Sequence, residues 1–134
     1  MEVMTVRHRT VPAARRKPVR YRKITAIIRR SRLEEVEGAL SKSGVSGVTV
    51  TPVKGFGEYK NFFARDPKVS HVKVEVFALA ERVDDFVRAI QGAARTGAPG
   101  DGFIAIEPVA ELVRVRTGEA AKDEDLCCCS TSDG

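Results

Sequence analysis

The chain has 134 residues, enough for one domain with a hydrophobic core of its own. Hydrophobic residues make up 43% and charged residues 31%, as in soluble globular proteins, and no apolar run approaches the roughly 18 residues that span a bilayer. The net charge of +5 comes from residues 1 to 23, and the remainder, with 15 basic and 17 acidic residues, lacks the charge of a nucleic-acid-binding domain.

The N-terminal segment is basic and polar. Residues 1 to 22 contain no apolar stretch of the kind that a secretory signal needs, and Pro12 and Pro18 interrupt any amphipathic helix. We expect a disordered extension on a cytoplasmic protein that does not insert into membranes. An organellar transit peptide is the alternative interpretation of such an Arg-rich segment.

A strand and a helix are predicted next. Residues 23 to 30 form a short apolar run rich in β-branched side chains, which predicts a strand. Ser31 with Glu34 three residues later indicates a capping box, and Gly44 indicates the end of the helix. The apolar positions that recur at helical spacing between them are Leu33, Val36, Ala39 and Leu40.

Two further strands are predicted around a loop. Residues 45 to 54 alternate valine with polar residues, and residues 71 to 77 alternate strictly. Between them, Gly55-Phe56-Gly57 ends the first run, and residues 58 to 70 have no clear period. We therefore expect a hairpin with a long connecting loop.

The second half repeats the pattern. A helix is predicted within residues 80 to 96 and a fourth strand at 103 to 106, joined by a glycine-rich turn. The apolar helix face is Val83, Phe86, Val87 and Ile90. The order β-α-β-β-α-β predicts the α+β class: a ferredoxin-like sandwich with both helices on one face of a four-stranded antiparallel sheet. Since the other face would be an exposed patch, we expect subunits to associate through it.

Two features are suited to phosphate. The turn from Thr96 to Gly102 can present backbone N–H groups to an anion, although a glycine turn taken alone is more often a structural connection. Arg114 and Arg116 project from the same side of an extended segment, where two guanidinium groups can grip phosphate oxygens or simply be solvated.

No set of residues points to catalysis or to a resident metal. The domain has a single histidine, His71, and no Ser/His/Asp, Cys/His/Asp or HExxH arrangement, so we expect a protein that is not an enzyme. The three cysteines, Cys127, Cys128 and Cys129, are consecutive in the polar segment 120 to 134, which we expect to be a flexible tail. An inert tail and a redox-active one both remain open.

Four stretches together resemble PII signal-transduction proteins. They are KITAIIRRSRLEEVEGALSKSGVSGVTVTPVKGFG, VKVEV, AARTGAPGDGFIAIEPV and VRVRTGE. In the terms of that family, the domain would cover residues 23 to 119, with a T-loop at 57 to 71, a B-loop at 95 to 103 and a C-loop at 111 to 119. The resemblance implies a compact homotrimer with nucleotide sites between neighbouring subunits.

The resemblance also implies which residues bind. Adenine and ribose would lie near Ile27, Thr49, Gly55, Phe56, Gly57 and Phe77. The phosphates would meet Gly100, Asp101 and Gly102, followed by Phe103, together with Arg114 and Arg116. No metal is required by this arrangement.

The chain departs from the family pattern in its effector ligands. Tyr59 and His71 stand where glutamine and lysine bind 2-oxoglutarate in typical members, and the T-loop is about seven residues shorter and lacks the tyrosine segment that some bacteria uridylylate. Ala98 and Phe103 replace lysines, and Glu58 replaces an arginine. We therefore expect ADP or AMP to bind more tightly than ATP.

Such departures are similar to those of a PII-like branch associated with carboxysomes and inorganic-carbon uptake. The resemblance implies bicarbonate as a co-effector, in a small-anion pocket formed by Gly57, Glu58, Tyr59 and Lys60, and a transporter or enzyme as the target of the T-loop. A conventional PII protein that senses ATP and 2-oxoglutarate is the main alternative. An enzyme, a trimeric scaffold and an RNA-binding module on the same fold are further alternatives.

Overall fold

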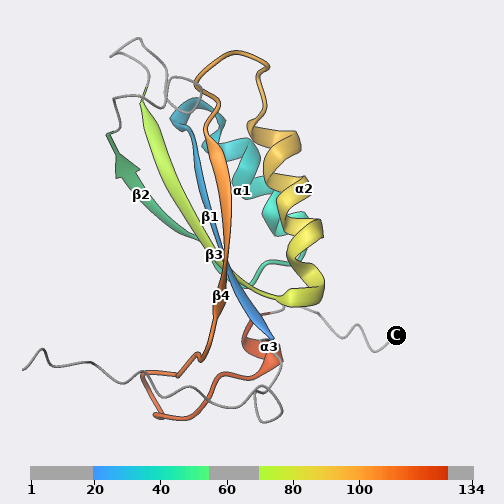
Figure 1. Ribbon diagram of the computed structural model, residues 1–134, viewed down its shortest axis with the longest axis vertical. Helices are drawn as coiled ribbons and strands as arrows, with labels where there is room; N and C mark the ends of the chain where they lie inside the picture. Colours follow the sequence, from blue (N-terminus) through green and yellow to red (C-terminus); the bar gives the residue numbers. More distant parts are fainter. Residues whose placement is uncertain (1–19, 55–69, 127–134) are drawn as a thin grey trace, which may run out of the picture.

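The computed structural model describes residues 20–54 and 70–126. One layer is a sheet and the other a pair of helices (Figure 1). The elements in chain order are β1 (Tyr21–Arg29), η2 (Arg30–Arg32), α1 (Leu33–Lys42), β2 (Thr49–Val53), β3 (His71–Leu79), η3 (Ala80–Arg82), α2 (Val83–Ala94), β4 (Phe103–Val109) and α3 (Asp123–Leu126).

The sheet confirms the predicted α+β, ferredoxin-like fold. Its strand order is β2-β3-β1-β4, and all neighbouring strands are antiparallel. Helices α1 and α2 both cover the same face (Figure 1). The two β-α-β units therefore interleave, with β1 and β3 as the central strands.

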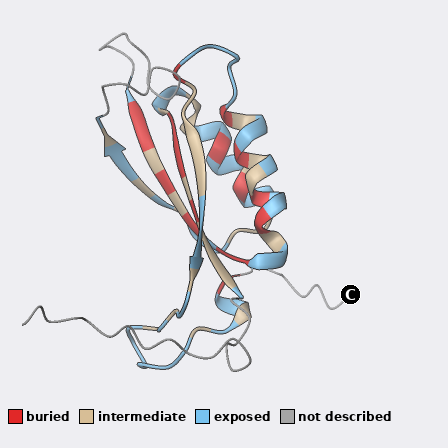
Figure 2. Ribbon diagram, in the orientation of Figure 1, coloured by how far each residue is buried: buried red, intermediate tan, exposed pale blue. Residues whose placement is uncertain are grey.

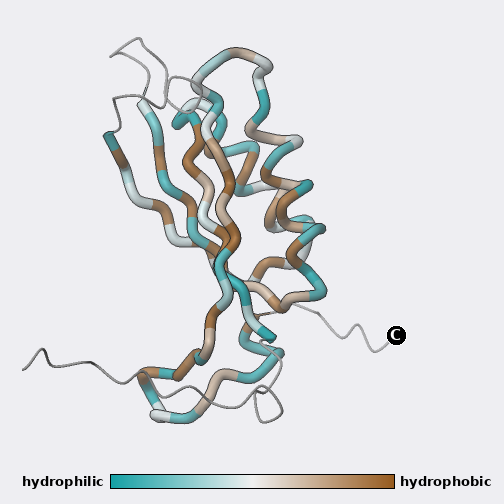
Figure 3. Tube along the Cα trace, viewed as in Figure 1, coloured by the Kyte–Doolittle hydropathy of each residue, from teal (hydrophilic) through white to brown (hydrophobic). Residues whose placement is uncertain are grey.

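The core lies between the helices and the two central strands. Ile24, Ala26 and Ile28 of β1 are buried on the side of the helices, and alternation along β3 buries Val72, Val74 and Val76 beside them. Figures 2 and 3 show this alternation of burial and hydropathy along the strands. The helices contribute Val36, Leu40, Val83, Phe86 and Ile90. The predicted apolar face of α2 is thus confirmed, with Val87 packed at its margin.

The predicted end of α1 is confirmed, whereas its predicted start is wrong. Gly44 has φ +87° and its N–H donates to Ser41, while the N–H of Val45 donates to Leu40, which together form a Schellman motif. No side chain caps the start of α1. Instead of a capping box at Ser31, the 3-10 turn η2 leads from the strand directly into the helix.

The boundaries of the domain differ from those expected at both ends. β1 begins at Tyr21, within the segment predicted to be a disordered extension. At the other end, Ala120 is paired with Val113 in a β-bridge, and α3 follows with Leu126 buried. The Tyr21 hydroxyl donates to the Ala121 carbonyl, 3.1 Å away. The segment from 120 to 126 is therefore packed against the domain.

The other face of the sheet carries no helix, and we call it the open face. It presents the odd-numbered residues of β1 and β3, among them Ile27 and Phe77, because successive side chains of a strand alternate between the faces. Phe77 is 39% exposed. Among the described residues, no helix is long and apolar enough to cross a membrane.

Candidate functional site

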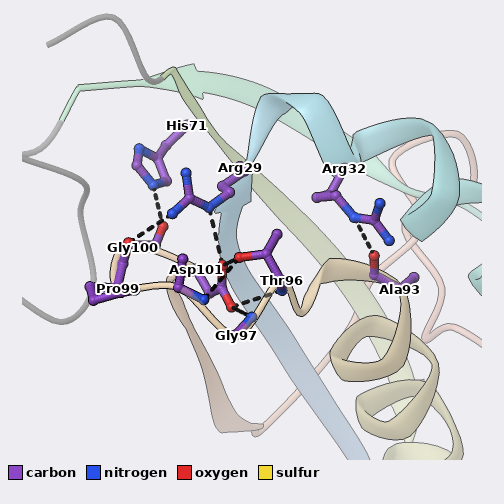
Figure 4. A network of polar contacts seen from close by, with 10 residues as sticks. Arg29, Arg32, His71, Ala93, Thr96, Gly97, Pro99, Gly100 and Asp101 are labelled. Atoms are coloured by element: carbon purple, nitrogen blue, oxygen red, sulfur yellow. Dashed lines mark hydrogen bonds and ion pairs between the residues drawn. The ribbon is translucent and has the colours of Figure 1, made fainter. Parts of the chain in front are cut away.

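Asp101 organises the B-loop, the turn between α2 and β4. Its carboxylate accepts hydrogen bonds from the N–H groups of Thr96 and Gly97, both at 2.9 Å, and from the Thr96 hydroxyl. The Nε of Arg29 donates to the same carboxylate at 3.1 Å (Figure 4). The loop is thus closed on itself and attached to the end of β1.

The charge of Asp101 is stabilised by these donors. Burial alone would raise its pKa, but the hydrogen bonds from Thr96, Gly97 and Arg29 outweigh burial, so the pKa lies well below its usual range. The carboxylate is consequently an internal anchor that neutralises Arg29.

Two carbonyl groups of the B-loop are held from the sheet. Arg29 donates from Nη2 to the carbonyl of Pro99 at 2.7 Å, and the Nε2 of His71 lies 2.8 Å from the carbonyl oxygen of Gly100 (Figure 4). His71 is only 5% exposed. The sequence singled out His71 but not Arg29, because their pairing across β1 and β3 depends on strand register.

The glycines of this loop are required by its backbone. Gly97, Gly100 and Gly102 all have positive φ, between +88° and +101°. At Gly102 a Cβ would also collide with the carbonyl group of Ile27. The loop therefore lies directly against β1.

The structure brings part of the predicted site together. Ile27 and Phe103 are paired across β1 and β4 on the open face, immediately below the B-loop. Thr49 on β2 is paired with Glu75 on β3. Phe77 follows Glu75 by two residues on β3, so Thr49 and Phe77 lie on the same face of the sheet. Thr49 is exposed. Gly55, Phe56, Gly57, Glu58, Tyr59 and Lys60 lie outside the described residues.

The C-loop forms a small hairpin at the other end of the sheet. The N–H of Arg114 donates to the carbonyl of Glu119 at 2.9 Å, and Gly118 donates back to Arg114 at 2.8 Å. Val115 and Arg116 are exposed at its tip. The predicted arginine pair is therefore carried by an ordered turn.

The side chain of Arg114 has an acidic neighbour that the sequence did not indicate. Its Nε donates to Asp125 of α3 at 2.7 Å. This hydrogen bond and one from the N–H of Lys122 lower the pKa of Asp125. Since the contact uses Nε, the guanidinium is oriented by α3.

The two features that the sequence suggests for phosphate, the B-loop and the arginines of the C-loop, lie at opposite ends of β4. The seven residues of β4 separate the B-loop from the C-loop (Figure 1), and at about 3.3 Å per residue this strand is roughly 20 Å long. Arg114 and Arg116 therefore do not reach Gly100, Asp101 and Gly102 of their own chain.

The described residues of a single chain offer little enclosure for a nucleotide. A cavity of about 260 Å³ lies behind the B-loop, between α2 and β4, and its walls include Ile90, Ala94 and Phe103. Pockets for small ligands usually measure about 300–1,000 Å³. Among the described residues, no group of three or more His, Cys, Asp or Glu side chains could hold a metal ion.

The chain is similar to known proteins over most of its length. Residues 21–119 match the family model described as Nitrogen regulatory protein P-II. The chain is 44% identical over 112 residues to a Nitrogen regulatory protein P-II of Azospirillum brasilense, in an alignment that covers 76% of this chain and 97% of that protein.

A plant relative and its structure are also similar. A Nitrogen regulatory protein P-II homolog of Arabidopsis thaliana is 39% identical over 108 residues, which cover 75% of this chain and 55% of the relative. The crystal structure of Arabidopsis thaliana PII bound to citrate superposes with a TM-score of 0.65 at 38% sequence identity, covering 77% of this chain and 87% of that one.

Proposed function

Because this chain belongs to the nitrogen regulatory protein P-II family, a family of signalling regulators, we propose that it is a homotrimer that binds an adenine nucleotide between its subunits. The observation that carries this proposal is the separation of the B-loop from the C-loop. A phosphate group that contacts both must take one loop from each of two chains.

The open face supports association of the chains. The hydroxyl of Thr25 is buried near the centre of this face and has no hydrogen-bond partner among the described residues. Phe77 and, at the tip of the C-loop, Val115 are exposed apolar side chains. Neighbouring subunits that packed here would remove Phe77 and Val115 from water, which favours association.

The adenine would lie on the open face. Ile27 and Phe103, which are paired across β1 and β4, would form an apolar floor below the B-loop, and Thr49 and Phe77 of a neighbour would provide a wall. Gly100 to Gly102 would bind the phosphates, together with the neighbour's Arg114 and Arg116. Gly55 to Gly57 are part of the proposed site but lie outside the described residues.

The proposed ligand is ADP or AMP, with ATP weaker. Ala98 is exposed in the B-loop and Phe103 follows it, where the family pattern has lysines. Each lost charge-assisted hydrogen bond costs about 1.5–3 kcal/mol, and the loss falls on the terminal phosphates. No metal is required by this proposal.

The proposed co-effector is bicarbonate rather than 2-oxoglutarate. His71, which replaces the lysine of 2-oxoglutarate sites, is buried and engaged with the B-loop carbonyl. A small-anion pocket formed by Gly57, Glu58, Tyr59 and Lys60 remains a proposal. The target would be a transporter or enzyme that binds the T-loop, as in the carboxysome-associated branch.

Isothermal titration calorimetry with ADP, AMP and ATP plus magnesium tests the proposal. We expect ADP or AMP to bind at least about tenfold more tightly than ATP, and bicarbonate to strengthen ADP binding. The variant Arg114→Ala/Arg116→Ala should weaken ADP binding strongly, and Arg88→Ala on the exposed side of α2 should not. Absence of nucleotide binding by the unaltered trimer would refute the proposal.

A conventional nitrogen sensor is the second candidate, favoured by the names of the relatives in Azospirillum and Arabidopsis. It would bind ATP more tightly in the presence of magnesium and 2-oxoglutarate. If 2-oxoglutarate strengthens ATP binding in the same titrations, this candidate replaces the first.

A further inference from the structure

Two side chains of the sheet hold consecutive carbonyl groups of the B-loop. Arg29 is the last residue of β1 and His71 the first of β3, and the two are direct partners in the ladder. Arg29 holds the Pro99 carbonyl at 2.7 Å, and His71 holds the Gly100 carbonyl at 2.8 Å (Figure 4). They act on adjacent peptide groups.

Holding a carbonyl fixes the N–H that follows it. In a trans peptide the C=O and the next N–H point in opposite directions, and the described chain has no cis peptide. The N–H of Gly100 therefore faces away from Arg29, whereas the N–H of Asp101 closes the hydrogen-bonded turn at residues 99–100. Within the described ranges, the N–H of Gly100 makes no backbone hydrogen bond.

The loop needs such anchors because its sequence permits another arrangement. Pro99 followed by Gly100 at φ +97° is typical of a type II turn. Rotation of the central peptide would exchange its C=O and N–H sides, and glycine allows both arrangements at little cost. The hydrogen bond from Arg29 selects one of them.

We propose that Arg29 and His71 are positioning residues for phosphate: by holding the Pro99 and Gly100 carbonyls they fix the orientation of this turn, so that the N–H of Gly100 faces an incoming phosphate. This inference rests on the proposed nucleotide site and names the device that shapes it. His71 stands where the family pattern has the lysine that binds 2-oxoglutarate. In this proposal it orders the B-loop by itself, so no bound effector is needed for that order.

The chemistry of His71 supports this role. A carbonyl oxygen only accepts, so the Nε2 of His71 must carry the proton and donate it. The ring is 5% exposed, so water does not replace this donor easily. Glutamine can place an amide donor in a similar position, whereas leucine fills the space without a donor.

The experiment compares ligands that differ only in phosphate. Binding of ADP and of adenosine is measured by calorimetry for the unaltered trimer, His71→Leu, His71→Gln and the control Arg88→Met. Adenosine reports on the nucleoside pocket, and the ratio of the two affinities reports on the phosphate groups. Thermal unfolding of each variant shows whether it is folded.

We expect His71→Leu to weaken ADP binding about tenfold and adenosine binding less than about twofold, as the loss of one well-placed donor implies. His71→Gln should recover most of the ADP affinity. Arg88→Met should match the unaltered protein.

The outcomes separate this inference from the function on which it rests. If the unaltered trimer binds no ADP, the proposed function fails. If the unaltered trimer binds ADP, two results would contradict the positioning role. One is that His71→Leu binds ADP and adenosine as tightly as the unaltered protein does, and the other is that it loses the same factor of affinity for both. Should His71→Leu not fold, Arg29→Met decides: an unchanged ratio of ADP to adenosine affinity overturns the proposal.

Discussion

Asp101 shows how one side chain fixes a loop. Four donors surround its carboxylate, from Thr96, Gly97 and Arg29. Its function in the B-loop depends on charge, because a neutral amide would satisfy fewer of these donors and would leave Arg29 without its counterion. Asp101 therefore has a structural role in the B-loop in addition to its place in the proposed phosphate site.

The substitution Asp101→Asn tests this charge. At pH 7 we expect the free energy of unfolding to fall by about 1–3 kcal/mol. Because the folded pKa of Asp101 is lowered, its contribution to stability is present above about pH 4, the unfolded pKa, and is lost as the pH falls toward the folded pKa. Urea unfolding at pH 7 and pH 3 should show a smaller loss of stability in acid for Asp101→Asn than for the unaltered chain.

Glu37→Gln, on the exposed side of α1, is the control for removing a carboxylate. Equal acid sensitivity of Asp101→Asn and the unaltered chain would contradict the role of the hydrogen bonds.

Gly102, also in the B-loop, has a position that leaves no room for a larger side chain. Alanine there would combine positive φ with a collision against the Ile27 carbonyl, whereas alanine at Gly97, at φ +88°, would meet nothing within 4 Å. We expect Gly97→Ala to cost about 1 kcal/mol and Gly102→Ala at least about twice as much. Chemical denaturation measures both, and similar losses would show that the close approach to β1 is unimportant.

At the scale of the elements, Arg82 joins the two helices. Its guanidinium donates to the Ser43 carbonyl at the end of α1, forms an ion pair with Asp85 of α2 at 2.7 Å, and lies 5.3 Å from the ring centre of Phe86. The terminal carbonyl of one helix is thus capped from the start of the other. This contact therefore connects the end of α1 to the start of α2.

Arg82→Met keeps the aliphatic part of the side chain and removes these polar contacts. We expect the free energy of unfolding to fall by about 1–2 kcal/mol, since the Ser43 carbonyl loses its donor and Phe86 its cation. Arg88→Met on the exposed side of the same helix should change stability by less than about 0.5 kcal/mol. Equal effects of the two substitutions would show that Arg82 does not join the helices.

At the scale of the whole molecule, the proposed nucleotide site depends on how the chains assemble. The B-loop and the C-loop of one chain are separated by the length of β4, so a site that uses both needs a neighbouring subunit. Cyclic symmetry would then give each trimer three such sites. Among the residues that the structure describes, the cavity beside the B-loop is about 260 Å³, smaller than most small-ligand pockets.

Mixed trimers test this arrangement. Ala98→Glu places a carboxylate in the B-loop, and Arg114→Ala/Arg116→Ala removes the cations of the C-loop, so each variant alone should bind ADP at least about tenfold more weakly. Chains refolded together in equal amounts should recover strong binding in about a quarter of the clefts, where an unaltered B-loop meets an unaltered C-loop. Calorimetry measures the number of sites, and native mass spectrometry verifies the mixing.

Mixed trimers that form without recovering strong binding would place the whole site within one chain.

The sequence by itself determined the element order, the helix-facing pattern and the end of α1, because these depend on local spacing and on single residues such as Gly44. The ferredoxin-like sheet followed from that order, and the glycines and arginines of the proposed site could be named from the resemblance to the family. The structure shows where those side chains lie in relation to one another.

Only the tertiary structure decided which distant groups meet. The pairing of Arg29 with His71 depends on the register of β1 and β3, and the contact of Arg114 with Asp125 depends on the packing of α3 beside the C-loop. No local pattern encodes either contact. Separation of the B-loop from the C-loop is likewise a property of the folded sheet, because they are near in sequence but at opposite ends of β4.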